Sequence, residues 1–94
     1  MNIVEEFEKY QGEFLKFERI ENPLHVRPDI CALLMIHAIV GGSGDVISGA
    51  DRDVFYFRAN QNDLAAKATS EQIRDLRRCG VSLFEGSGAL GMFR

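Results

Sequence analysis

Three closely spaced arginines are the residues of this chain whose type and spacing could do chemistry. Arg74 and Arg78 are four residues apart and share a face on a helix, with Arg77 beside them. Guanidinium groups bind phosphates and carboxylates through paired hydrogen bonds. With Arg27, they form a candidate partner- or anion-binding site. If they form such a recognition face, changing Arg74, Arg77 and Arg78 to Glu would abolish binding while barely altering the melting temperature. The alternative is a solvated helix face, partly neutralised by neighbouring acids.

The histidines and cysteines do not form a recognisable catalytic or metal-binding motif. His25 lies in a linker, while His37 and Cys31 fall on different faces of one predicted helix. Neither cysteine has zinc-ligand spacing, and no serine or cysteine lies in a nucleophile elbow. The sequence therefore predicts no metal, no cofactor and no catalytic residue, and it favours a non-enzymatic role. An enzyme whose catalytic pair comes from separate segments stays open as an alternative.

Two further patterns resemble ligand sites only superficially. The glycine-rich segment 41–45 follows a helix, and it has neither the lysine of a phosphate-binding loop nor the dinucleotide-binding glycine spacing. Asp45, Asp51 and Asp53 do not match a calcium loop, and Arg52 lies among them. A flexible turn and solvated acids are the preferred interpretations.

An apolar segment, residues 28–40, dominates the architecture. Pro28 and Asp29 suit a helix start, and Gly41 with Gly42 suits its end. Between Ile30 and Val40 only one residue, His37, is polar. Without a polar stripe, this helix is expected to be buried on nearly all sides, so that Leu34→Asp would unfold the protein.

Periodicity and capping patterns predict the other elements. Thr69 with Gln72 is a capping box that starts a helix ending at Gly80, and Asn2 with Glu5 resembles one. The predicted helices are 2–10, 63–68 and 70–79, and the predicted strands are 54–58, 81–85 and 89–93. The pattern leaves residues 13–21 and 46–53 unassigned.

These elements predict an α+β fold in one domain, residues 1–94. The expected sheet is small and mixed, with three or four strands packed on the buried central helix. Strands 54–58 and 81–85 flank helices, as in a parallel, right-handed β-α-β unit. Segment 86–88 joins the last two strands as a C-terminal hairpin.

Strand 54–58 is apolar on both faces and needs cover on both. The residues expected at a homodimer interface are Val54, Phe55, Tyr56 and Phe57. A chain of 94 residues has few other elements to cover them, so the sequence predicts a homodimer.

Composition limits the class of partner. The chain is 46% hydrophobic and 27% charged, which indicates a folded domain, and its net charge of −3 makes nucleic acid or an anionic membrane an unlikely generic partner. We expect no signal peptide and no membrane span. Cys31 and Cys79 are expected to stay reduced in a cytoplasmic protein.

Four stretches together resemble a family of small, uncharacterised phage and prophage proteins. They are residues 17–23 with His25 and residues 27–29, residues 45–48 with Asp53, residues 75–76 with residues 78–81, and residues 90–93. The resemblance implies no catalytic residues. It implies a small interaction protein, such as an inhibitor of a host or defence machine. The alternative function is a ligand- or nucleotide-binding regulator that uses the arginine helix.

Overall fold

Capping side chains start three of the four α-helices in a computed structural model, which describes residues 2–84 and 86–93. The predicted box on α4 (Ser70–Cys79) is confirmed: Thr69 Oγ1 accepts from the Gln72 amide at 3.2 Å, and the Thr69 amide donates to Gln72 Oε1 at 2.8 Å. A second box, between Asn60 and Asp63, starts α3 (Gln61–Lys67), two residues before the helix expected at 63–68. Gly80 ends α4 with a φ of 104°, a conformation that favours glycine.

The remaining elements complete an α+β fold, as expected. They are α1 (Ile3–Lys9), the short 3₁₀ turns Gln11–Glu13 and Phe17–Arg19, α2 (Pro28–Val40), β1 (Ile47–Ala50), β2 (Val54–Asn60), β3 (Val81–Phe84) and β4 (Ala89–Phe93). The second 3₁₀ turn and β1 lie in the segments that the sequence pattern left unassigned, and the first 3₁₀ turn overlaps them only at Glu13. The strand expected at 81–85 ends at Phe84, and Glu85 lies outside the described residues.

The sheet is antiparallel, which corrects the expected mixed sheet. Its strand order is β1-β2-β4-β3. The β3–β4 hairpin is confirmed, with Val81 opposite Met92 and Phe84 opposite Ala89. β2 and β3 run in the same direction, but β4 lies between them and pairs antiparallel with both, so they do not form the expected parallel neighbours. The connection through α3 and α4 leads from β2 to β3 and leaves room for one strand between them. β4 occupies this place, and its residues Leu90, Gly91 and Met92 are buried.

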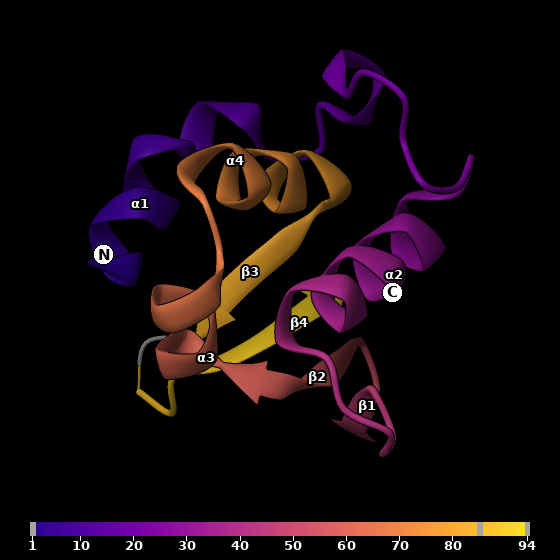
Figure 1. Ribbon diagram of the computed structural model, residues 1–94, viewed down its shortest axis with the longest axis vertical. Helices are drawn as coiled ribbons and strands as arrows, with labels where there is room; N and C mark the ends of the chain where they lie inside the picture. Colours follow the sequence, from indigo (N-terminus) through magenta and orange to yellow (C-terminus); the bar gives the residue numbers. More distant parts are fainter. Residues whose placement is uncertain (1, 85, 94) are drawn as a thin grey trace.

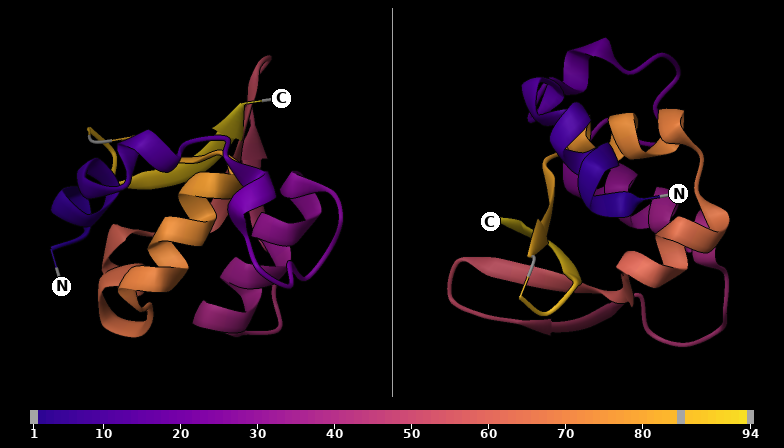
Figure 2. Two further views of the ribbon diagram at one scale, coloured as in Figure 1. Left: turned by 90° about the horizontal axis from the view of Figure 1, so that it is seen from above. Right: turned by 90° about the vertical axis from the view of Figure 1, so that its left-hand side faces the viewer.

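The helices lie on one face of the sheet, giving two layers (Figures 1 and 2). Their inner sides and the inner sheet face share one core, which includes Phe7, Ile36, Leu64, Leu76 and Leu90. Within the described residues, no helix covers the opposite sheet face (Figure 2). There the Tyr56 and Phe84 rings lie 5.6 Å apart between centroids, and Phe93 is 61% exposed.

The expectation that α2 is buried on nearly all sides is wrong. Cys31, Ala32 and Ile36 are buried, but Leu34 is 40% exposed, and His37 and Ala38 are also exposed. The helix lies at the end of the helical layer, where α3 and α4 contact only its inner side (Figure 1). Because α2 is apolar on all sides but covered on only one, its outer face is an exposed apolar surface.

Candidate functional site

Arg78 is built into the structure as an internal cross-link. Its Nε donates to Glu13 Oε2 at 3.2 Å, and its Nη1 donates to Asp75 Oδ1 at 3.2 Å and to the Arg19 carbonyl at 3.1 Å. Its side chain is only 13% exposed. Hydrogen bonding from Arg78, aided by Arg19, holds the pKa of Glu13 below its ordinary value of 4.5. Arg78 thereby ties the 3₁₀ turns to α4.

Arg77 lies between aromatic rings. Its guanidinium carbon is 5.5 Å from the Phe7 ring centroid and 5.1 Å from that of Phe14, and Nη1 donates to the Val81 carbonyl at 3.1 Å. Burial lowers its pKa, and among the described residues its Nε has no hydrogen-bond partner. This side chain is packed into the protein, so Arg77 does not belong to an exposed recognition face of the kind on which the three-arginine replacement was expected to leave the melting temperature nearly unchanged.

Arg74 is the arginine of α4 nearest to the expected solvated state. Its Nε donates to Asp75 Oδ1 at 3.3 Å. A polar hollow of about 460 Å³ brings Arg74 and Arg78 together with Arg19, Glu21 and Asp75. Arg77 and Arg27 do not line this hollow; Arg27 instead pairs with Asp29 at 2.9 Å. The predicted basic cluster is thus divided, and carboxylates accompany the arginines that remain together.

The histidines and cysteines take structural positions. His37 is exposed, and its Nε2 lies 3.1 Å from the Gly42 carbonyl, while His25 Nδ1 accepts from the Arg27 amide at 3.0 Å. Cys31 and Cys79 are buried free thiols, and burial raises the pKa of Cys79, so that thiol stays protonated at neutral pH. Over residues 2–84 and 86–93, no three His, Cys, Asp or Glu side chains gather as a metal site would require.

The four residues expected at a dimer interface separate onto two faces of β2. Phe57 is 2% exposed and belongs to the core, and Val54 is also buried, so neither is available as an interface. Phe55 faces the helical side, where it packs on the core. Tyr56 faces the open side, where its Oη donates to Asp51 Oδ2 at 3.0 Å.

An apolar groove separates α2 from the edge of the sheet. It has a volume of about 290 Å³ and is lined by Asp29, Ile30, Leu33, Ile47, Ala50 and Phe55. A shallower hollow continues it along Leu33, Asp45, Val46 and Ile47. Ile47 is 41% exposed, so the groove has an open apolar rim.

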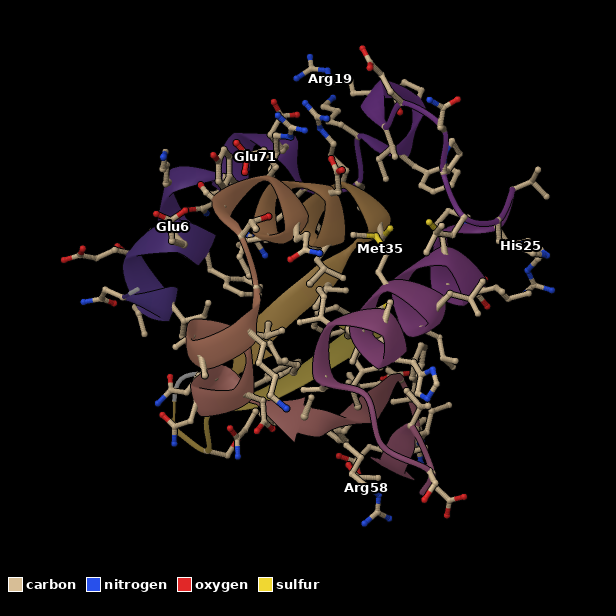
Figure 3. The ribbon with its side chains drawn as sticks, in the orientation of Figure 1. Glu6, Arg19, His25, Met35, Arg58 and Glu71 are labelled. Carbon is tan, nitrogen blue, oxygen red and sulfur yellow. The ribbon has the colours of Figure 1, made fainter. Side chains whose placement is uncertain are left out.

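We call Ile30, Leu33, Leu34, Ile47 and Phe55 the α2–β1 surface. In Figure 3, α2 and the side chains near it lie at one flank of the molecule. Of these five, sequence reasoning assigned an interface role only to Phe55. The missing polar stripe in segment 28–40 was the available signal, because an all-apolar helix in a small domain must be covered either by the domain itself or by a partner.

Comparison with known proteins adds no relative: no family model, no curated protein and no solved structure matches this chain. None of the helices within the described residues has the length and apolar character needed to cross a bilayer.

Proposed function

We propose that this chain is a non-enzymatic protein-binding domain whose docking surface is the α2–β1 surface. The exposure of Leu34 and Ile47 beside an apolar groove carries the proposal. A monomer normally covers large apolar side chains that cluster in this way, and exposed patches of this kind mark interaction sites. Arg77 and Arg78, two of the four arginines considered as binding groups, are occupied by contacts within the chain.

The nature of the partner belongs to the same proposal. The resemblance to phage and prophage proteins supports a host or defence component, which this domain would bind and block. A homodimer is also proposed, now through the open sheet face that carries Tyr56, Phe84 and Phe93. That face is separate from the α2–β1 surface, because Tyr56 and Phe55 point to opposite sides of β2.

The polar hollow supports a second candidate function, as a small-anion or nucleotide sensor. Arg19, Arg74 and Arg78 all line it, but Glu21 and Asp75 line it too. Titration with ATP or inorganic phosphate, followed by amide chemical shifts, tests this candidate. Saturable shifts at Arg74 and Arg78 would support it, and shifts that rise linearly with ligand would contradict it.

Capture from host lysate with matched surface variants tests the protein-binding proposal. The wild type and Leu34→Arg are compared, with Val26→Arg as control because Val26 is 83% exposed and outside the α2–β1 surface. We expect one or more proteins to be retained by the wild type and by Val26→Arg and lost with Leu34→Arg, at unchanged melting temperature. Identical capture by all three proteins would contradict the assignment of this surface.

A further inference from the structure

β1 is an uncovered edge of the sheet. It pairs with β2 on one side, and all four of its residues are exposed. The opposite edge differs: Val81 of β3 is fully buried, α1 and α4 contact β3, and Arg77 donates to the Val81 carbonyl. Proteins usually protect exposed edges because their free N–H and C=O groups pair with other strands. Only the β1 edge is left available in the part of the sheet that the structure describes.

The groove lies where a strand added to β1 would place its side chains. Ile47 and Ala50 line it from β1, and they pair with Phe57 and Phe55 of β2, whose side chains face the helical layer. α2 supplies the opposite wall through Ile30 and Leu33. An added strand would present every second side chain to this face. The groove therefore suits an apolar side chain of a chain that is extended along β1.

Charge at the groove favours one kind of extended chain. Asp45 lies beside Leu33 and Ile47 in the adjoining hollow, and it has no ion pair among the described residues. Asp29, at the other end, is already paired with Arg27. A basic side chain next to the apolar one would bring an opposite charge to Asp45.

We propose that the β1 edge binds an extended peptide segment of a partner protein as a fifth strand, with an apolar side chain in the α2–β1 groove and a Lys or Arg at Asp45. This inference rests on the proposed protein-binding function and specifies its mode. Strand addition takes affinity from main-chain hydrogen bonds and specificity from pockets for alternate side chains, and both elements are present here.

A displayed library of random dodecapeptides is the probe, and selected peptides are then synthesised. We expect them to share an apolar residue with a Lys or Arg nearby. N-methylation of single peptide amides should weaken binding at every second position, because only alternate amides of an added strand point to the edge. Equal sensitivity at consecutive amides, or no selected peptide, would overturn the strand mode.

Protein variants locate the peptide. Ala50→Arg fills the groove from an exposed position, and Ala66→Arg makes the same change on an exposed position of α3. We expect at least a ten-fold loss of affinity with Ala50→Arg, several-fold weaker and less salt-sensitive binding with Asp45→Asn, and no change with Ala66→Arg. Peptide binding that survives Ala50→Arg would overturn this site. So would a dimer that forms without peptide and is lost with Ala50→Arg, because a second copy would then occupy the edge.

The two proposals fail separately. If lysate capture depends on Leu34 while peptides show no alternate pattern, the domain binds proteins in another mode. If peptides bind β1 but capture does not depend on Leu34, the edge is a peptide site, and Leu34 does not belong to the docking surface.

Discussion

The guanidinium of Arg77 lies 5.1 Å from the centroid of the Phe14 ring, and this contact joins α4 to the segment after α1. Phe7 contributes a second ring at 5.5 Å, so the cation is held mainly by aromatic rings and the Val81 carbonyl. Cation–π pairs are stronger when the cation is partly removed from water. The sequence pattern makes Arg77 a candidate surface ligand, but in the fold its guanidinium packs on the rings of Phe7 and Phe14.

Arg77→Met is expected to lower the free energy of unfolding by about 1–2 kcal/mol, through loss of the cation–π contacts and one hydrogen bond. Arg77→Glu should cost at least about twice as much, because it puts a carboxylate against ring faces and a carbonyl oxygen. Urea unfolding measures both, and Arg74→Met is the control. Equal effects of Arg77→Glu and Arg74→Met would contradict the buried position.

Glu13 predicts an acid-sensitive contribution to stability. Its folded pKa is lowered by hydrogen bonds from Arg78 and Arg19. A lowered folded pKa stabilises the protein above the ordinary value of 4.5 and ceases to do so as the pH falls through the folded pKa.

Urea midpoints measured from about pH 7 to about pH 3 check this contribution. The wild type should lose stability more steeply than Glu13→Gln below the ordinary pKa. Glu18→Gln, at an exposed position with no ion pair among the described residues, should follow the wild type. Parallel curves for all three proteins would show that Glu13 has no such role.

Leu34 and Ile36 give a matched pair on α2. Leu34→Asp should cost only about 0.5–1 kcal/mol, mostly through helix propensity, because this position is exposed. Ile36→Asp should cost more than about 3 kcal/mol, because Ile36 is fully buried. Thermal melts followed by circular dichroism distinguish the two variants. Unfolding of Leu34→Asp would contradict the exposed position of Leu34 and support a helix that is buried on all sides.

Gly91 is expected to tolerate no side chain. A Cβ there would lie 2.7 Å from the Phe55 carbonyl oxygen and 3.0 Å from Phe84 Cε2. Gly91→Ala should therefore destabilise the protein by roughly 1–3 kcal/mol. Gly49→Ala, on the same sheet with open space around the new methyl, is the control and should be neutral or slightly stabilising. Denaturant titration of both variants provides the comparison.

The open sheet face predicts the oligomeric state. Light scattering at micromolar concentration should give about twice the chain mass of 10.6 kDa. Phe93→Lys should shift the protein to the mass of one chain, since Phe93 is exposed beside Phe84. A wild type that scatters as one chain would contradict the dimer.

Local sequence signals predicted which helices and strands form more successfully than they predicted what surrounds each of them. Thr69 and Gln72 cap each other across three residues, so their box is readable from the sequence. The role of Arg78 depends on Glu13, 65 residues away, and no local pattern connects them. The apolar composition of α2 likewise does not show which of its residues the domain covers, because Leu34 is exposed while Ile36 is buried.

The sheet illustrates the same limit. β1 contains Ser48 and Gly49 and is exposed throughout, so it lacks the alternation by which half-buried strands are recognised. Placing β4 between β2 and β3 depends on packing across the whole sheet. The candidate site could not be predicted for the same two reasons. Its walls come from β1, which has no recognisable strand pattern, and from the side of α2 that the domain leaves uncovered.

The central position of β4 also affects how the chain folds during synthesis. β4 is the last of the four strands along the chain, yet it pairs with both β2 and β3. While a ribosome still holds residues 89–93, the nascent chain has two separated strand edges and an apolar helix without its sheet. Such intermediates are prone to aggregate or to engage chaperones. The sheet of this domain is therefore expected to close only after residues 89–93 have left the ribosome.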